Sequence, residues 1–155
     1  MNVIQDKVRS LMVPLAGSTL LVPNVAVAEV VGYSEPAPVS DAPDWVLGVM
    51  DWRGHRIPLI SFEALRGEPV PALSAQARIA VLNTVTGDRR VPFYALVTAG
   101  IPRLLRVGAD DVQSAGALEP ATGELARVQV NGMPAVIPDL KRLEGLVTGY
   151  WKQAA

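Results

Sequence analysis

The stretch WVLGVMDWRGHRIPLISF, residues 45–62, holds two apolar runs separated by a short polar segment. We expect residues 45–52 to form one strand and residues 56–62 its antiparallel partner. The polar segment Arg53-Gly54-His55 lies between them, and its glycine tolerates the positive φ of a tight turn. The stretch therefore predicts a β-hairpin, and Phe62–Leu65 at its end is typical of one helical turn.

The pattern of this hairpin returns in the second half of the chain. Residues 53–67 align without gaps on residues 131–145, so Gly54 and Gly132 are 132 − 54 = 78 positions apart. Asn131-Gly132 between apolar runs is itself a strong hairpin signal. Chance similarity between two hairpins is one explanation. A duplicated β-unit, each copy closing into a small barrel, is the other.

The remaining segments are short and are separated by turn residues. Glycine and proline number 13 each and are spread along the chain, which favours many short strands over long helices. We expect hairpins at residues 8–23, 78–98 and 125–137, a bent strand or a helix followed by a strand at 25–31, a strand at 104–107, one helical turn at 139–143, and loops at 34–43 and 67–77. The predicted fold class is mainly β with short helical turns.

Length and composition limit the function classes. The 155 residues suffice for one compact domain, which we place at residues 8–145, with tails at 1–7 and 146–155. A net charge of −1 offers no basic excess for nucleic acid, and the absence of cysteine excludes disulfides and cysteine-based zinc sites. No apolar run approaches the ~20 residues of a transmembrane helix, and the polar start lacks the order of a signal peptide. We expect a cytoplasmic protein without membrane insertion.

Candidates for catalytic chemistry are few. The only histidine, His55, lies in a predicted turn, where a solvated surface residue is the simpler interpretation. The sequence has no GxSxG, GxxxxGK[ST] or GxGxxG motif. The acidic pairs Asp110-Asp111 and Asp41/Asp44 lie in predicted loops and suit solvation or capping better than catalysis. We therefore expect a protein that is not an enzyme and that has neither a metal nor a cofactor.

The two tryptophans of residues 45–52 are seven positions apart. An odd separation along a strand places Trp45 and Trp52 on opposite faces, so we expect one to pack inward and the other to lie nearer the surface. An exposed Trp52 beside Arg53 would be typical of an interface anchor. The sequence equally allows both tryptophans to be packed in the core or in loops.

Residues 45–62 resemble the signature of the CheW family of chemotaxis coupling proteins, in Gly48, in Arg53-Gly54 and in the apolar-Pro-apolar strand that follows. Residues 27–33, VAEVVGY, are similar to the end of another family strand, Val-x-Glu-Ile. The resemblance implies two small five-stranded SH3-like β-barrels, intertwined on a shared core and joined around residues 67–77. By motif matching and by the tryptophan argument, the candidate partner-binding residues are Glu29, Gly48, Trp52, Arg53 and Gly54.

The same resemblance implies a signalling adaptor that couples methyl-accepting chemoreceptors to a CheA-like histidine kinase. In our hypothesis, a barrel end with edge backbone groups meets the regulatory domain of the kinase, and a groove near Arg53 and Glu29 receives the cytoplasmic tip of the receptor. The segments PNVAVAEVV, DWRG and SFEAL also resemble the ChpC-type adaptors of pilus-linked systems, which control twitching motility.

Several residues depart from the family pattern. Asp51-Trp52 stands where Asn-Leu is common, Ser61-Phe62 replaces Asp-Leu, and Thr98 stands where an acid is expected. The C-terminal helix of the family is expected to be short or absent here. Two other functions stay open: a small-ligand-binding or enzymatic β-barrel that uses a cleft near His55 or Asp139, and a structural scaffold that forms arrays without contacting a kinase.

Overall fold

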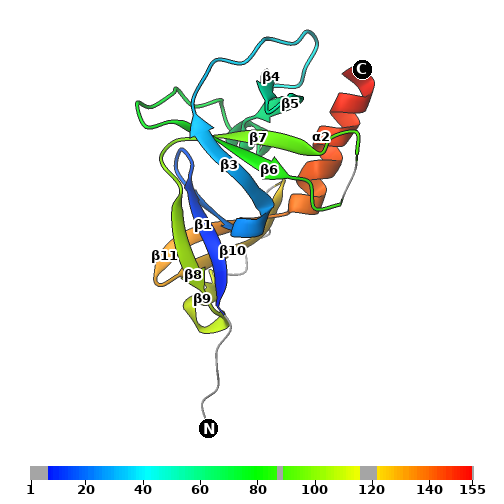
Figure 1. The fold of residues 1–155 in the computed structure, drawn as a ribbon. Helices are drawn as coiled ribbons and strands as arrows, with labels where there is room; N and C mark the ends of the chain where they lie inside the picture. The colour runs from blue at the N-terminus through cyan, green and yellow to red at the C-terminus, as the bar shows by residue number, and fades with distance from the viewer. Residues whose placement is uncertain (1–6, 87–88, 116–121, 155) are drawn as a thin grey trace.

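Two β-sheets make up most of the protein (Figure 1). The computed structural model describes residues 7–86, 89–115 and 122–154. The six-stranded sheet has the order β8-β1-β2-β11-β10-β9. Its strands, in that order, are Arg103–Val107, Val8–Pro14, Thr19–Pro23, Met133–Pro138, Glu124–Val130 and Val112–Ser114.

The other sheet has five strands in the order β3-β6-β7-β5-β4. These strands are Val27–Gly32, Arg78–Asn83, Phe93–Thr98, His55–Ile60 and Val46–Trp52. Short helices precede β3, follow β5 and precede β9: η1 (Asn24–Ala26), α1 (Phe62–Leu65) and η2 (Ala109–Asp111). The prediction of a mainly β fold with two SH3-like barrel subdomains is confirmed, although the three-residue strand β9 brings one sheet to six strands.

Each sheet combines strands from both halves of the chain. Strand β3 of the first half pairs antiparallel with β6 of the second, and β8 of the second half pairs antiparallel with β1 of the first. The parallel pairings β5–β7 and β11–β2 cross between the halves in the same way. The two halves therefore exchange strands, and neither sheet is made by one half of the chain alone.

The two hairpins with matching sequences also have matching turns. Arg53 and Gly54, between β4 and β5, have φ values of 46° and 79°. Asn131 and Gly132, between β10 and β11, have φ values of 50° and 82°. Two consecutive positive φ values at a two-residue loop are typical of a type I′ turn, whose twist matches that of the strands it joins. The likeness of the two segments thus extends from sequence to backbone conformation, which favours the duplicated unit over chance.

A helix follows each of these hairpins, and a side chain caps each helix. The hydroxyl of Ser61 accepts the Ala64 N–H at 3.2 Å at the start of α1. The carboxylate of Asp139 accepts the Arg142 N–H at 3.0 Å at the start of the C-terminal helix α2 (Leu140–Ala154). Ser61 and Asp139 occupy matching positions, 139 − 61 = 78 residues apart. Both side chains satisfy an N–H group that the helix itself leaves unpaired.

The C-terminal helix corrects three expectations: that residues 139–143 form a single turn, that residues 146–155 are a tail, and that the C-terminal helix of the family is short or absent here. Helix α2 runs over Leu140–Ala154. Gly145 and Gly149 each disfavour a helix by about 1 kcal/mol relative to alanine. Leu143 and Val147, one helical turn apart, are almost completely buried, and this burial outweighs the glycine cost. Of the described residues, no helix is long and apolar enough to cross a membrane.

Three apolar clusters fill the protein. The cluster of the six-stranded sheet contains Met12, Leu21, Val107, Val128, Val130 and Ala135. The cluster of the five-stranded sheet contains Trp52, Ile57, Leu59, Ile79, Val81 and Ala95. A third cluster, here called the joint core, takes residues from both sheets and both α-helices: Val13, Leu15, Leu20, Val22, Ile60, Phe62, Leu65, Leu82, Val91, Tyr94, Leu96, Val136, Leu143 and Val147.

Some strands are buried on both faces because one face lines a barrel and the other lines the joint core. In β2, Leu21 belongs to the cluster of the six-stranded sheet and Leu20 to the joint core. In β7, Ala95 belongs to the cluster of the five-stranded sheet and Tyr94 to the joint core. This double burial explains why these strands are continuous apolar runs in the sequence rather than alternating ones.

Candidate partner-binding site

Glu29, Trp52 and Arg53 meet where the five-stranded sheet closes on itself. Glu29 lies on β3 and Trp52 on β4, the two outermost strands in the sheet order. Arg53 Nη2 lies 3.1 Å from Glu29 Oε2, and Trp52 Nε1 donates a hydrogen bond of 2.8 Å to the same oxygen. The Arg53 guanidinium lies over the Trp52 ring, 5.1 Å from its centroid. The sheet therefore curls into a barrel, which brings these three candidate residues together beside Gly54.

Burial differs sharply among these side chains. The Arg53 side chain is 68% exposed and that of Glu29 is 35% exposed, whereas Trp52 is buried. A guanidinium has five N–H donors, and among the described residues the ion-pair partner of Arg53 is one oxygen of Glu29. Arg53 is thus fixed from below by an indole and a carboxylate, while its outer donors face solvent. Such a group can bond to carbonyl or carboxylate oxygens of another protein.

Of the two interpretations that the sequence leaves open for Trp52, the structure supports packing in the core and contradicts an exposed anchor. Trp52 belongs to the cluster of the five-stranded sheet, and its ring meets the Phe93 ring edge-on, with 4.8 Å between the centroids. Trp45, which precedes β4, is half-buried against the joint core. A bulge between Val46 and Gly48 inserts one extra residue into the strand, so counting positions by twos does not give the faces of the two tryptophans.

Gly48 lies four positions before Trp52 on β4, at this bulge. Its φ is 151°, and a Cβ there would be 2.3 Å from the carbonyl oxygen of Ala37. Val49 and Ala37 exchange two backbone hydrogen bonds, both of 2.9 Å. Gly48 therefore allows the loop of residues 33–44 to pair with the edge of the sheet, a packing role that accounts for the glycine without any partner.

The comparison with protein families now decides the class of the chain. A model of the CheW-like domain matches residues 9–145. The chain belongs to the CheW-like family. The crystal structure of the scaffolding protein TtCheW from Thermoanaerobacter tengcongensis is similar to it, with a TM-score of 0.72 and 15% identity over 86% of this chain and 85% of that chain. This structural similarity shows the fold. A comparison with curated proteins found no match to the chain. Family membership supports a scaffolding or adaptor role in chemotaxis signalling.

In this CheW-like domain, Thr98 occupies the position where the family pattern suggested an acid. Its side chain is buried at the end of β7. The hydroxyl donates to the Gly100 carbonyl at 2.7 Å and accepts the Arg78 N–H at 3.2 Å. A carboxylate has no proton to donate to that carbonyl and would be desolvated there. The threonine therefore fits its backbone surroundings better than the expected acid.

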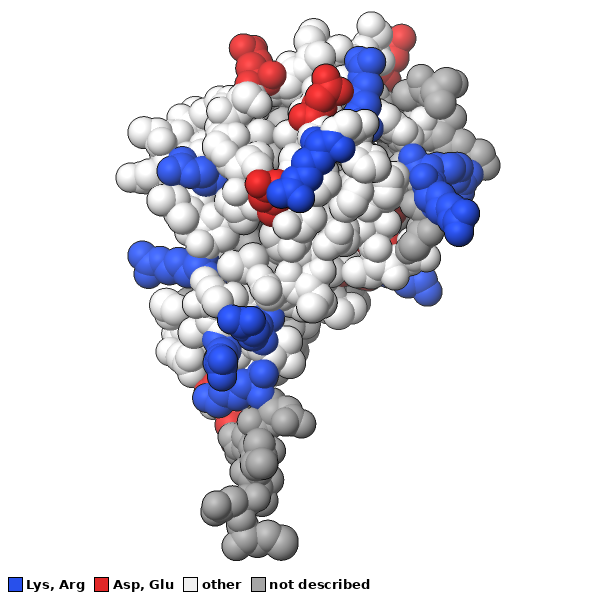
Figure 2. All heavy atoms as spheres, in the orientation of Figure 1, with Lys and Arg blue, Asp and Glu red and all other residues white. Residues whose placement is uncertain are grey.

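Basic side chains gather at the lower end of the six-stranded sheet, and Figure 2 shows them as a blue group near β1 and β8. Arg9 and Arg106 are directly opposite each other across these strands, and both are exposed. Like charges in such a cross-strand pair repel each other. The two arginines are 97 positions apart and the net charge is −1, so local sequence patterns do not predict this patch.

His55 and Asp139 have separate local roles. His55 is exposed at the start of β5 and meets the Phe93 ring edge-on at 5.0 Å. Asp139 is the N-terminal cap of α2 described above. Within the described ranges, no group of three or more His, Cys, Asp or Glu residues could hold a metal ion. Asp139 also lines an open surface cavity of about 530 Å³, but His55 does not line it, so a cleft that uses both residues has no support.

Among the described residues, Tyr94 and Asp111 have shifted pKa values, and neither lies at the Arg53 turn. Burial raises the pKa of the Tyr94 phenol well above its ordinary range, and the Glu144 carboxylate adds to the shift. The pKa of Asp111 is lowered, first because the Gly108 N–H donates to its carboxylate at 2.7 Å, and further because Lys7 is close. Both shifts concern the stability of the fold.

Proposed function

We propose that this CheW-like protein is a non-enzymatic adaptor that couples chemoreceptors to a CheA-like histidine kinase in the cytoplasm. The Arg53 turn carries the proposal. Its guanidinium is largely exposed, yet Glu29 and Trp52 hold it in place. A side chain fixed in this way loses little conformational freedom when it binds a partner. We assign it to the receptor tip, and we assign a barrel end to the regulatory domain of the kinase.

Charge reversal tests the role of the turn. Arg53→Glu and Glu29→Lys variants are compared with the natural protein in equilibrium binding to a purified receptor tip and to a kinase regulatory domain. Each variant is expected to weaken receptor binding by about tenfold or more, because a desolvated arginine at an interface centre contributes on the order of 2 kcal/mol. Arg56→Glu, an exposed arginine on β5 next to the turn, is the matched control and should change binding little.

A double variant separates binding from local structure. Arg53→Glu combined with Glu29→Lys rebuilds the ion pair in reverse, so its melting temperature should exceed that of the single variants. Its receptor binding should stay weak, because the exposed charge is now negative. Recovery of binding in the double variant would show that the pair serves only the fold. If the natural protein binds the receptor tip but no kinase domain, the scaffold without kinase contact is the better description.

We further propose that the receptor and kinase belong to a pilus-linked system that controls twitching motility. The support is the resemblance of PNVAVAEVV, DWRG and SFEAL to adaptors of such systems. Regulatory domains of a pilus-linked and a flagellar kinase from one bacterium, measured side by side, test this proposal. Tighter binding to the pilus-linked domain is expected, and equal or reversed preference would contradict it.

A further inference from the structure

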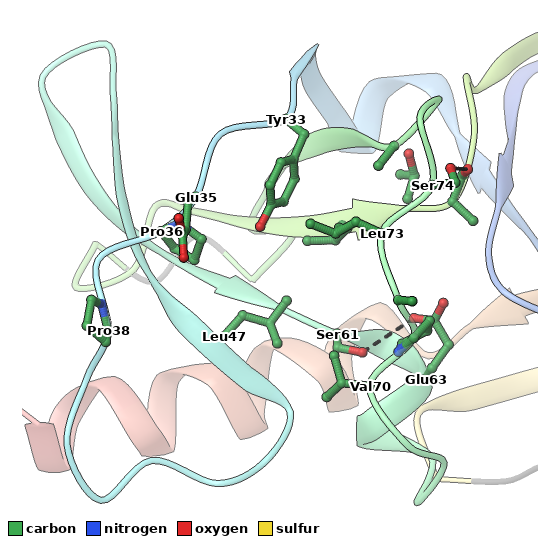
Figure 3. Close-up of a pocket in the computed structure, with 16 residues that line it drawn as sticks. Tyr33, Glu35, Pro36, Pro38, Leu47, Ser61, Glu63, Val70, Leu73 and Ser74 are labelled. Atoms are coloured by element: carbon green, nitrogen blue, oxygen red, sulfur yellow. Dashed lines mark hydrogen bonds between the residues drawn. The ribbon is translucent and has the colours of Figure 1, made fainter.

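A cavity of about 330 Å³ lies between two proline-rich loops beside the five-stranded sheet (Figure 3). Residues 33–38, after β3, form one wall, and residues 70–77, before β6, form the other. Sites for small organic molecules begin at about 300 Å³ and are mostly apolar. From the sequence, both loops were expected only as connections. The cavity is formed by residues that are far apart in the chain, so local patterns give no sign of it.

Apolar side chains supply most of the lining. Leu47 on β4 lies at the base in Figure 3, and Val70 and Leu73 extend from the second loop. Val70 and Leu73 are 48% and 55% exposed, which is high for large apolar side chains. These side chains could cover the apolar part of a ligand.

The charged residues that line the cavity are both acidic, Glu35 and Glu63. In Figure 3, Glu35 lies with Tyr33 on one side of the opening, and Glu63 lies with Ser61 on the opposite side. Glu63 is only 5% exposed. Its Oε2 accepts the Ala16 N–H at 3.0 Å, whereas its Oε1 accepts a long hydrogen bond of 3.4 Å from the Ser61 hydroxyl. A buried carboxylate oxygen gains free energy from a further, stronger donor.

We propose that this cavity binds a small organic amine, a protonated primary ammonium on an apolar body. An ammonium group brings a positive charge and three N–H donors for Glu63 or Glu35. The Tyr33 ring can add a cation–π contact. An anion would be repelled by both carboxylates. A neutral apolar molecule would give Glu63 Oε1 no further hydrogen-bond donor. The inference does not depend on the adaptor role.

Three probes of equal chain length test the charge requirement: hexylamine, 1-hexanol and hexanoate. Binding to the full chain at pH 7 is measured by ligand-observed NMR and by calorimetry. Hexylamine should bind saturably and at least tenfold more tightly than the alcohol, because an ion-paired hydrogen bond is about twice as strong as a neutral one. Hexanoate should bind most weakly. Equal binding of hexylamine and 1-hexanol would overturn the proposal.

Variants locate the site. Glu35→Gln, in an exposed loop position, and Glu63→Gln should each weaken hexylamine binding several-fold and leave 1-hexanol binding unchanged. Ala72→Trp, in the second loop, should block all three probes by filling the opening. Asp51→Asn removes an exposed carboxylate outside the cavity and should have no effect. If Glu63→Gln does not fold, Glu35→Gln and Ala72→Trp decide. Unchanged hexylamine affinity in both would show that the amine binds elsewhere.

Discussion

Because Gly48 has no side chain, the loop of residues 33–44 can pack against β4. Gly48 has a φ of 151°, and a Cβ added there would meet the backbone of Ala37 and the ring of Pro36. We predict that Gly48→Ala lowers the free energy of unfolding by about 2 kcal/mol, because the new Cβ would overlap the Ala37 carbonyl oxygen and strain the backbone. Urea denaturation followed by circular dichroism measures the change.

Gly145→Ala is the matched control for this prediction. Apart from its chain neighbours and the nearby backbone of its own helix, no atom lies within 4 Å of a Cβ placed at Gly145, which is exposed in α2. Alanine is favoured over glycine in a helix by about 1 kcal/mol, so this variant should be at least as stable as the natural protein. If Gly48→Ala were equally well tolerated, the loop of residues 33–44 would not be held against β4 as described.

Asp111 gives the fold a dependence on pH whose sign follows from its contacts. The Gly108 N–H favours the charged carboxylate and lowers its pKa in the folded state. A lowered folded pKa stabilises the protein above the unfolded value of about 3.9. This stabilisation is lost as the pH falls through the lowered pKa. We predict that the natural protein has a higher free energy of unfolding than the Asp111→Asn variant. This difference should be constant from pH 7 to about 4.5 and should become smaller at lower pH.

Urea titrations at a series of pH values measure this difference. Lys7→Met should retain most of it, because the backbone N–H of Gly108 is the main cause of the shift and Lys7 a smaller one. A difference that is independent of pH, or that widens in acid, would contradict the assignment.

The single residues differ in how well the sequence predicts them. The turn glycines Gly54 and Gly132 are predictable, because a two-residue hairpin needs positive φ and few residues adopt it. The burial of Trp52 is not, because it depends on a bulge and on Glu29 from a strand 23 positions away. The ion pair of Glu29 with Arg53 is likewise hidden, since it needs the sheet to close. Sequence matching named these residues without indicating that they touch.

At the scale of elements, a buried carboxylate ties each helix to a hairpin connection. Glu63 in α1 accepts the Ala16 N–H from the β1–β2 connection. Glu144 in α2 accepts the N–H groups of Val85 and Thr86 from the β6–β7 connection. The role recurs in both halves, although the two glutamates are not at matching positions of the repeat. Each helix is thus anchored over the joint core by ionic hydrogen bonds as well as by apolar contacts.

We predict that Glu144→Gln lowers the free energy of unfolding by about 2 kcal/mol. An amide has one oxygen, so one of the two backbone N–H groups would face another N–H and lose its acceptor. Glu68→Gln is the control, since the Glu68 side chain is 52% exposed and its ion pair with Arg66 should contribute less than about 1 kcal/mol. Thermal and urea denaturation compare the two. Equal effects would mean that Glu144 is not a selective anchor of α2.

Local elements are predictable where short-range chemistry decides them. The hairpins at 45–62 and 125–137 follow from turn residues and apolar runs. The pairings β3–β6 and β1–β8 do not, because each joins strands from different halves and depends on the closure of both barrels. The length of α2 is also not predictable from the sequence. Its glycines argue against a helix, and only the joint core, assembled from distant strands, supplies the burial that offsets them.

For the whole molecule, strand exchange couples the two barrels. Residues of β1, β2, β6 and β7 contribute to the joint core from one face and to a barrel from the other, so neither barrel can lose its packing without exposing the joint core. A separate half of the chain would lack strands of both sheets. The protein should therefore unfold as one unit despite its two barrels.

Val130→Ala tests this coupling from one side of the molecule. Val130 is completely buried in the cluster of the six-stranded sheet, whereas Trp52 belongs to the cluster of the other sheet. The substitution should cost about 2 kcal/mol through lost burial and a cavity. We predict that tryptophan fluorescence and far-ultraviolet circular dichroism shift to lower urea by the same amount and stay superimposed. If the fluorescence of the tryptophans kept its original midpoint while the dichroism signal moved, the barrels would unfold separately, and the joint core would not bind them into one cooperative unit.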